Sequence, residues 1–220
     1  MHGFILLLLL LLGIVVFLCC WIFMTRKGLA SYYIRGYMYQ KLGQHMNAVA
    51  NYSKAIEIKS DEADAYYLRG CSYNDLGEFN KAIEDFSKAI EIEPENPENY
   101  GMREQAYSAL GQYEKAIADI DIAIKLGNEY SESYVLRGYA HENLQQYEKA
   151  IEDYSKSIEL KPKKPETPYW MRGNMYEKIG QYEKAAEDFF KAVQLNPNDQ
   201  NFQAKLRELI KTIENNHHES

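Results

Sequence analysis

Residues 63–96 read ADAYYLRGCSYNDLGEFNKAIEDFSKAIEIEPEN, and this pattern recurs along the chain at a spacing of 34 residues. The matching windows are 29–62, 63–96, 97–130, 131–164 and, after one inserted residue, 166–199. A fixed period of this length is typical of solenoids, in which each repeat buries its apolar face only against its neighbours. The period therefore predicts a repeat array whose product is a long surface and not a catalytic pocket.

Each window has the pattern of two helices joined by a tight turn. Within each half, apolar residues recur at three- and four-residue steps, which is helical periodicity. The twentieth position is alanine in every window: Ala48, Ala82, Ala116, Ala150 and Ala185. Four windows carry a glycine where the first helix needs a left-handed stop: Gly43, Gly77, Gly111 and Gly180. Pro94, Pro162 and Pro197 then end the second helix, because proline lacks the donor that a further turn needs.

Two neighbouring positions of the first helix also repeat. The eighth position is glycine in four windows: Gly36, Gly70, Gly138 and Gly173. Glycine inside a helix costs about 1 kcal/mol relative to alanine, so we expect an offsetting close approach to the invariant alanine of the second helix. The residue before it is arginine in every window: Arg35, Arg69, Arg103, Arg137 and Arg172. An arginine that recurs with the period suggests a structural role, and we expect it to pair with acidic residues of second helices, for example Arg69 with Asp85.

The order of an aromatic residue, Gly, Tyr, Gly, Ala, an aromatic residue, Ala and Pro resembles the tetratricopeptide repeat (TPR). The resemblance extends over residues 29–199 and implies an all-α, TPR-type α-solenoid, a right-handed superhelix of helix pairs. It also implies that the first helices line a concave groove that binds a peptide or a helix of a partner. The departures from the family pattern are Glu104 for Gly, His141 for Tyr, Gln145 for the turn Gly, and Ser60 and Asn128 for Pro.

The array is followed by a pattern that predicts a capping helix over residues 200–214. Five apolar residues fall on one helical face: Phe202, Leu206, Leu209, Ile210 and Ile213. A solenoid needs such a helix to cover its last apolar face. Residues 215–220 read as a disordered polar tail, in which His217 and His218 have no nearby partner ligand for a metal.

The N-terminus predicts a membrane anchor. After a leader of residues 1–3, residues 4–24 form a run of 21 residues without a charge, and a helix of that length matches a hydrocarbon core of roughly 30 Å. Sixteen of these residues are Leu, Ile, Val or Phe, which gives an upper estimate of roughly −5 to −10 kcal/mol for insertion. Residues 25–28 are then a short tether to the first window, so the array must lie close to the bilayer.

Two other fates of this segment are open. Cleavage as a signal peptide would need a shorter apolar run, and the candidate site at Ala30 lies inside the first window. Lipidation at Cys19 or Cys20 is disfavoured by the bulky residues Phe17 and Leu18 before them.

Orientation follows from the flanking charge. The basic residues near the segment all lie on its C-terminal side: Arg26, Lys27, Arg35 and Lys41. The positive-inside rule therefore predicts a single-pass protein with its repeats in the cytoplasm, with the periplasm or a lumen as the alternative.

Composition and motifs argue against several other classes. The chain carries 32 acidic and 25 basic residues and has no basic cluster, which disfavours nucleic acid as a partner. There is no Gly-rich phosphate loop, metal-ligand spacing or nucleophile motif. His45 and His141 stand where sister windows have aromatic residues, so they read as packing substitutes. We therefore expect no enzyme activity, no catalytic residues, no metal and no cofactor.

Once the periodic residues are set aside, a small set remains for binding. The fifth and ninth positions face the groove in the family that this chain resembles, and they hold five aromatic residues: Tyr33, Tyr37, Tyr67, Tyr139 and Trp170. Four polar residues add to the candidate peptide groove: Lys41, Asn74, Asn143 and Asn174. Several acidic residues make this groove mildly acidic, so an apolar or basic peptide is the expected guest. Because Tyr33 and Tyr37 replace the Lys and Asn of chaperone-tail clamps, the sequence argues against a chaperone C-terminal tail.

The resulting functional expectation is a membrane-anchored scaffold or adaptor. It would bind a protein or peptide partner near the membrane and take part in the assembly or organisation of a membrane-associated complex. The alternative is a structural subunit that packs into a larger membrane complex by its outer face or by its membrane helix.

Overall fold

A computed structural model describes residues 27–219, with side chains up to Asn215. The membrane span expected at residues 4–24 lies outside these described residues. Among the helices from residue 27 onward, none combines the length and apolar character needed to cross a bilayer.

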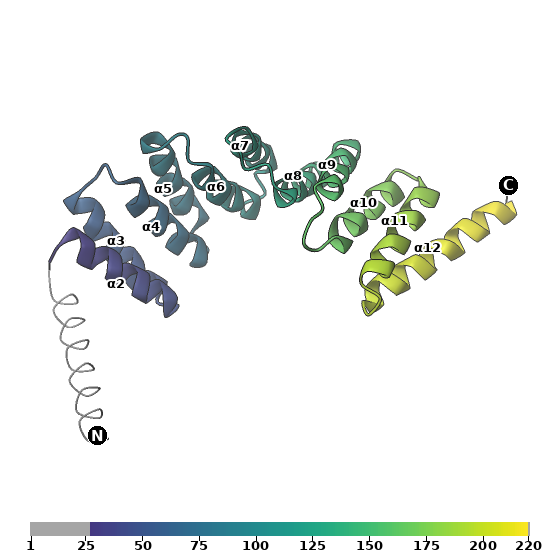
Figure 1. Cartoon of the computed structure of the whole chain (residues 1–220), viewed down its shortest axis with the longest axis horizontal. Coiled ribbons are helices and arrows are strands. Elements are labelled where there is room, and N and C mark those ends of the chain that lie inside the picture. The colour runs from purple at the N-terminus through teal and green to yellow at the C-terminus, as the bar shows by residue number, and fades with distance from the viewer. Residues whose placement is uncertain (1–26, 220) are drawn as a thin grey trace, which may run out of the picture. The chain divides into compact units, whose positions relative to one another are not determined.

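The described residues form antiparallel helix pairs in the order that the period predicts (Figure 1). The first helices of the windows are α2 (Leu29–Lys41), α4 (Ala63–Asp75), α6 (Pro97–Ala109), α8 (Ser131–Asn143) and α10 (Glu166–Lys178). Their partners are α3 (His45–Ile58), α5 (Phe79–Ile92), α7 (Tyr113–Lys125), α9 (Tyr147–Glu159) and α11 (Tyr182–Leu195), and α12 (Gln200–Glu219) follows. The pairs divide into two compact units, one ending at Pro94 and the other beginning at Glu95.

The turns between paired helices form as expected. The turn glycines adopt left-handed backbone angles, for example a φ of 73° at Gly77. The amide of the next residue, Glu78, donates to the Tyr73 carbonyl oxygen at 2.9 Å and so satisfies the open end of the helix. Gln145 takes the same place with a φ of 57°. A residue with a side chain there stores backbone strain that glycine avoids.

The glycines of the first helices contact a different residue from the expected one. A Cβ atom at Gly36 would lie 2.5 Å from the ring of Tyr52, and one at Gly70 would lie 2.8 Å from the ring of Phe86. Gly138 and Gly173 meet Tyr154 and Phe189 in the same way. The prediction that the invariant alanine supplies the close contact was wrong. The aromatic ring at the twenty-fourth position lies across the glycine and fills that space.

Glu104 is the exception at this position, and other residues of its own window make room for its side chain and bond its carboxylate. The twenty-fourth position there is Ile120, which has no ring. Glu104 is only 2% exposed, and its carboxylate accepts a hydrogen bond from the Ser108 hydroxyl at 2.8 Å. Burial raises the pKa of Glu104 above its ordinary value, with a further contribution from the charge of Asp119.

The capping helix is present and longer than expected. Leu209 is buried against Ala185 and Phe189, with Leu206 and Ile213 beside it. Ile210, expected on the buried face, is 43% exposed. Residues 215–219, expected to be a disordered tail, continue α12 as helix to Glu219.

Candidate functional site

Four of the five periodic arginines pair with aspartates of their partner helices, as the sequence predicts. In the first window, which carries Arg35, the position of the aspartate holds Asn51. The guanidinium of Arg69 donates to both oxygens of Asp85, from Nε at 2.8 Å and from Nη2 at 2.7 Å. The other pairs of this kind are Arg103–Asp119, Arg137–Asp153 and Arg172–Asp188. The hydrogen bonds that Arg69 donates to Asp85 raise the pKa of Arg69. Because each aspartate is buried and accepts from its arginine, these groups belong to the scaffold and are not free for a ligand.

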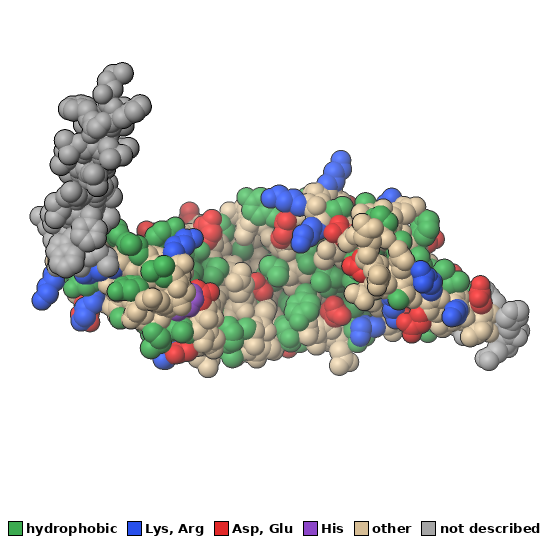
Figure 2. All heavy atoms as spheres, turned by 90° about the horizontal axis from the view of Figure 1, so that it is seen from below, with side chains coloured by type: hydrophobic (Ala, Val, Ile, Leu, Met, Phe, Trp, Pro, Cys, Tyr) green, Lys and Arg blue, Asp and Glu red, His purple; other side chains and the backbone are tan. Residues whose placement is uncertain are grey.

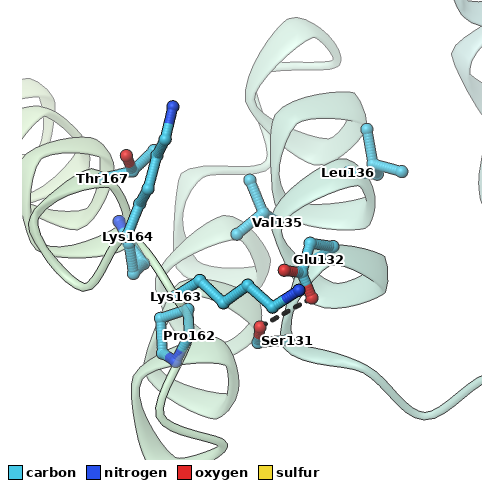
Figure 3. Close-up of a pocket in the computed structure, with 9 residues that line it drawn as sticks. Ser131, Glu132, Val135, Leu136, Pro162, Lys163, Lys164 and Thr167 are labelled. Atoms are coloured by element: carbon cyan, nitrogen blue, oxygen red, sulfur yellow. Dashed lines mark hydrogen bonds between the residues drawn. The ribbon is translucent and has the colours of Figure 1, made fainter.

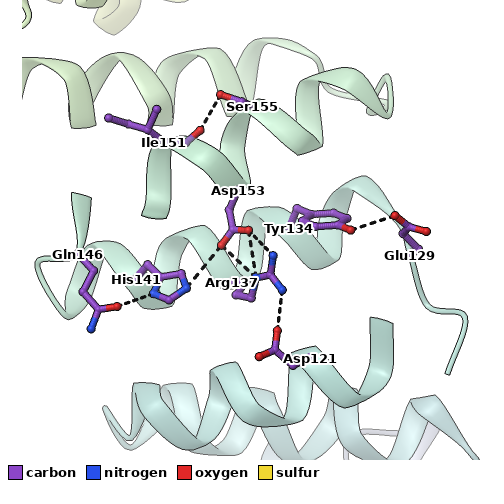
Figure 4. A network of polar contacts seen from close by, with 9 residues as sticks. All are labelled: Asp121, Glu129, Tyr134, Arg137, His141, Gln146, Ile151, Asp153 and Ser155. Carbon is purple, nitrogen blue, oxygen red and sulfur yellow. Dashed lines mark hydrogen bonds and ion pairs between the residues drawn. The ribbon is translucent and has the colours of Figure 1, made fainter. Parts of the chain in front are cut away.

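The pair in the fourth window differs from its sisters (Figure 4). Arg69 also donates to Ser53 of the preceding second helix at 3.0 Å, whereas Arg137 donates at the equivalent place to Asp121 at 2.6 Å. Arg137 thus lies between two carboxylates. His141 borders the same cluster, with its Nε2 at 3.8 Å from Asp153 and its Nδ1 at 3.0 Å from Gln146. The cluster joins α7, α8 and α9 by charge, and its polar groups are already paired with one another.

In the first unit, the candidate groove residues fall into two groups. Tyr37 is 53% exposed, and the Lys41 ammonium lies 5.3 Å above its ring. Tyr33 and Tyr67 are half-buried, with their rings packed on Tyr52 and Phe86 respectively.

Two of the half-buried polar groups here lack a hydrogen-bond partner. The Tyr33 hydroxyl is buried without one, and burial together with Glu62 and Asp64 raises its pKa to about 12. The Asn74 side-chain oxygen is likewise buried and unpaired. These two atoms are closed off from the surface, whereas Tyr37 and Lys41 offer an accessible ring and charge.

In the second unit, the candidate groove residues differ in how accessible they are to a partner. Tyr139 is 43% exposed, and its ring centroid lies 6.3 Å from that of Tyr113 in an edge-on arrangement. Asn143 and Asn174 each donate to a backbone carbonyl one turn earlier, of Tyr139 and Trp170 respectively. Their amide groups are thus partly engaged.

Trp170 is not an open groove residue. Its ring stacks on Phe202 of α12 at 4.5 Å between centroids, and the centroid of Phe189 lies 4.8 Å away. The expectation that Trp170 is available as a free aromatic contact is therefore corrected, because the capping helix covers it.

A pocket between α8 and α10 is the feature that the groove assignment missed (Figure 3). It has a volume of about 400 Å³, and the atoms exposed inside it are almost all apolar, although several of the lining residues carry polar groups. Val135 and Leu136 of α8 form one side, and Thr167 of α10 faces them with the connection that holds Pro162 (Figure 3). The remaining lining residues are Ser131, Glu132, Lys163, Lys164 and Pro168.

The pocket coincides with the one break in the period. The inserted residue before the fifth window lengthens the connection from α9 to α10, and Lys161 in it has a left-handed φ of 53°. Charged side chains lie at the rim: Lys163, Lys164 and Glu132, with the Lys163 ammonium directed toward Glu132 (Figure 3). Hydrogen bonds from the backbone and from Ser131 lower the pKa of Glu132, so this carboxylate is ionised at neutral pH. The insertion itself was the sequence signal for this site.

The described residues offer little for other chemistry. They contain no group of three or more His, Cys, Asp and Glu side chains that could hold a metal. Burial raises the pKa of the Cys71 thiol to about 11, so it is a poor nucleophile at neutral pH. The arrangement can bind apolar and polar parts of another molecule, and it presents no set of convergent reactive groups.

Comparisons with known proteins agree with this description. A family model described as Tetratricopeptide repeat matches residues 63–96, 131–164 and 171–199, and one described as TPR repeat matches residues 36–73. Window 97–130, which carries Glu104, is not among the matched residues. A comparison with curated proteins gave no match.

Solved structures share the fold over most of the chain. A crystal structure of MamA protein superimposes with a TM-score of 0.73 at 26% identity, covering 77% of this chain and 92% of that one. A MamA structure from Desulfovibrio magneticus RS-1 has a TM-score of 0.73 at 20% identity, covering 80% and 99%. YrrB, described as a TPR protein with an unusual peptide-binding site, has a TM-score of 0.71 at 22% identity, covering 83% and 94%. These likenesses support the all-α solenoid of helix pairs.

Proposed function

Because the chain belongs to the tetratricopeptide repeat family, we propose that it is a protein-interaction scaffold that binds a segment of a partner protein on its first helices. The observation that carries this proposal is the apolar pocket between α8 and α10. A cavity of about 400 Å³ lies at the lower end of the usual size for ligand pockets. It can accept an apolar side chain or two from a peptide or helix.

The lining explains why such a side chain would bind. Leu136 is 42% exposed beside the pocket, so a bound apolar group would remove both its own surface and that of Leu136 from water. Each fully buried large apolar side chain contributes about 1.5–3 kcal/mol. The lysines and Glu132 at the rim can bond the polar flanks of the segment and fix its direction. An apolar anchor residue with polar neighbours is therefore the proposed guest of the second unit.

The first unit offers a surface of different chemistry. Tyr37 and Lys41 are accessible there, and the exposed carboxylates Asp64 and Asp75 lie on the neighbouring first helix α4. An aromatic surface with carboxylates favours basic or apolar residues, as the composition of the first helices predicts. We propose that Tyr33, Tyr37, Lys41, Tyr67 and Asn74 contribute to this surface, and that Tyr139, Asn143 and Asn174 contribute to the one in the second unit.

We further propose that residues 4–24 anchor the scaffold in a membrane as a single span. The support is the charge-free run of 21 residues, which is long enough for a helix to cross a hydrocarbon core. The basic residues that follow it favour a cytoplasmic position for the repeats. The scaffold would then hold its partner close to the bilayer, in the assembly or organisation of a membrane-associated complex.

A crosslinking experiment in cells tests the pocket. A photoreactive amino acid replaces Leu136 in the full chain, and the matched control carries it at Leu160, which has a similar exposure of 37% but does not line the pocket. We expect a discrete crosslinked partner from position 136 and none from position 160. Leu136→Asp should then weaken binding of that purified partner about tenfold or more, and Leu160→Asp should leave it unchanged. Equal capture from both positions would refute the pocket as the binding site.

Two simpler measurements test the anchor and the alternative. Alkaline carbonate extraction should leave the full chain in the membrane pellet, and protease treatment of sealed membranes should show on which side the repeats lie. Native size after extraction in mild detergent separates a scaffold from a structural subunit, since a subunit would not be recovered alone.

A further inference from the structure

The first helix pair exposes an apolar surface, here called the α2 face, which consists of Ile34, Met38, Leu42 and Met46. Ile34 and Met38 lie on α2, Leu42 follows four residues later as the C-cap of that helix, and Met46 lies in the first turn of α3. Their exposed fractions are 43%, 43%, 67% and 63%. Figure 2 shows hydrophobic side chains together with basic and some acidic ones at the end of the molecule where the first window lies.

Part of the α2 face corresponds to the surface that, in later windows, packs against the preceding helix pair. The position of Met38 is occupied in later windows by residues with no exposed surface, among them Ser72, Ala140 and Met175. Met175 packs on Tyr154 of the preceding pair. In the first window, no helix pair within the described residues covers this position, and it nevertheless holds a large apolar side chain.

Met46 shows that the face is more apolar than the repeat requires. Its position is exposed in the other windows and holds only polar residues there: Asn80, Glu114, Glu148 and Glu183. Nothing in the packing of a helix pair calls for methionine at this place. Met46 is therefore apolar at a position that is polar and exposed to water in the other windows. An exposed apolar side chain of this kind indicates a partner outside the helix pairs.

The charge of this part of the chain indicates what that partner is. The first acidic residue of the sequence is Glu57, so residues 1–56 contain five basic residues and no acidic one. The rest of the chain holds the other 20 basic residues and all 32 acidic ones. Asp75 of α4 also reaches this region, where its carboxylate lies 3.1 Å from Nδ1 of His45. An apolar stripe within a basic segment is the composition of a helix that lies on an anionic lipid surface.

The length of the connection brings the α2 face to that surface. If residues 4–24 span the bilayer, only residues 25–28 separate the span from the start of α2. Four residues reach at most about 14 Å, and the 13 residues of α2 extend about 20 Å. A second copy of the chain would bring two positively charged segments together, which disfavours it as the occupant.

We propose that the α2 face lies against the anionic surface of the membrane, with its four apolar side chains at the boundary between headgroups and acyl chains. This inference rests on the proposed membrane anchor. The docked helix would fix the orientation of the first unit relative to the bilayer, which a four-residue tether alone leaves free.

The test uses the full chain in vesicles of phosphatidylcholine with phosphatidylserine. A nitroxide label is placed at Met46→Cys in a background in which the three native cysteines are replaced, and the matched controls carry it at Glu114→Cys and Glu148→Cys. The collision rates of each label with oxygen and with a water-soluble nickel chelate are measured. We expect the label at position 46 to be accessible to oxygen and shielded from nickel, and the two controls to show the reverse.

Two further variations sharpen the result. Omitting phosphatidylserine should raise the nickel accessibility at position 46 at least twofold. Met46→Glu restores the kind of residue found in the later windows at a position 63% exposed, so it leaves the fold intact. It should raise the nickel accessibility of a label at Leu42→Cys by a similar factor.

Flotation of the same vesicles separates this inference from the anchor. A chain that floats while the label at position 46 stays open to nickel would overturn the α2 face as a membrane contact and leave the anchor standing. A chain that does not float would overturn both. A label shielded from both reagents, with a short dipolar distance to its counterpart in another copy, would show that a second copy covers the face.

Discussion

Gly70→Ala tests the contact that sets the spacing of paired helices. An ideal Cβ atom at this position lies 2.8 Å from one ring carbon of Phe86 and 3.0 Å from the next. Real Cβ contacts are longer than this, and Phe86 is fully buried, so neither side can move away without a shift of the backbone. Overpacking of this kind costs about 1–3 kcal/mol. Against it stands a gain of about 1 kcal/mol from the higher helix propensity of alanine.

The net expectation for Gly70→Ala is a loss of stability of roughly 0–2 kcal/mol. Gly101→Ala is the matched control, because this glycine is also in a first helix and a Cβ atom there meets nothing within 4 Å. That variant should gain about 1 kcal/mol. The difference between the two variants, about 1–3 kcal/mol, is the cost of the ring contact.

The third window suggests a double-mutant cycle that combines Gly70→Ala with a change at Phe86. It has Glu104 opposite Ile120 in place of a glycine opposite a ring. We therefore expect Gly70→Ala to be better tolerated in a Phe86→Ile background, with a favourable coupling energy of about 1–3 kcal/mol in the double-mutant cycle. Urea unfolding of the full chain in mild detergent, followed by circular dichroism at 222 nm, measures all of these values. A Gly70→Ala variant that gains as much as Gly101→Ala, or a coupling energy near zero, would refute the reasoning.

Three further predictions concern single positions. Gln145→Gly should raise the free energy of unfolding by about 1 kcal/mol, because it removes the strain of a left-handed φ of 57° at an exposed turn; an unchanged urea midpoint would contradict this. Arg69→Ala should lower it by about 3 kcal/mol, because the buried carboxylate of Asp85 loses its partner, and adding Asp85→Asn should restore part of the loss. Glu104 has a raised pKa in the folded state, so the folded chain binds its proton more tightly than the unfolded chain, and stability from this group falls as pH rises above the ordinary value of 4.5. Glu104→Gln keeps the acceptor for Ser108 and should stabilise the chain at pH 7 by on the order of 1 kcal/mol, with a flatter pH dependence in unfolding measured between pH 4 and pH 8.

The period was sufficient to predict the helix pairs, their turns and the Arg69–Asp85 type of ion pair. These features depend on contacts within one window, and a pattern repeated several times reports such contacts directly. The glycine contact could not be assigned in the same way, because the alanine and the aromatic residue of the second helix both recur with the period. Only the geometry shows that the ring of Phe86, and not an alanine, lies across Gly70.

The candidate site was less predictable because it depends on contacts between windows and beyond them. Trp170 occupies a groove position in the pattern, but the pattern does not say where a capping helix will lie, and Phe202 covers the ring. The pocket beside Leu136 arises from the connection between α9 and α10, whose path depends on the inserted residue and on the left-handed Lys161. Sequence reasoning identified the insertion but had no means of deriving a cavity from it.

Some residues that differ from the repeat pattern are accommodated by other residues of the fold, and some are not. Glu104 departs from glycine, but Ile120 in the same window departs from an aromatic residue, and the carboxylate has a hydrogen bond from Ser108. A change that is balanced inside the fold needs no external partner to explain it. Met46 has no such balance, because it is apolar and 63% exposed where sister windows are polar. The insertion before the fifth window likewise leaves an apolar pocket that is open to the solvent. The unbalanced departures are therefore the places where this scaffold is expected to meet other molecules, a membrane at the first window and a partner segment between the fourth and fifth.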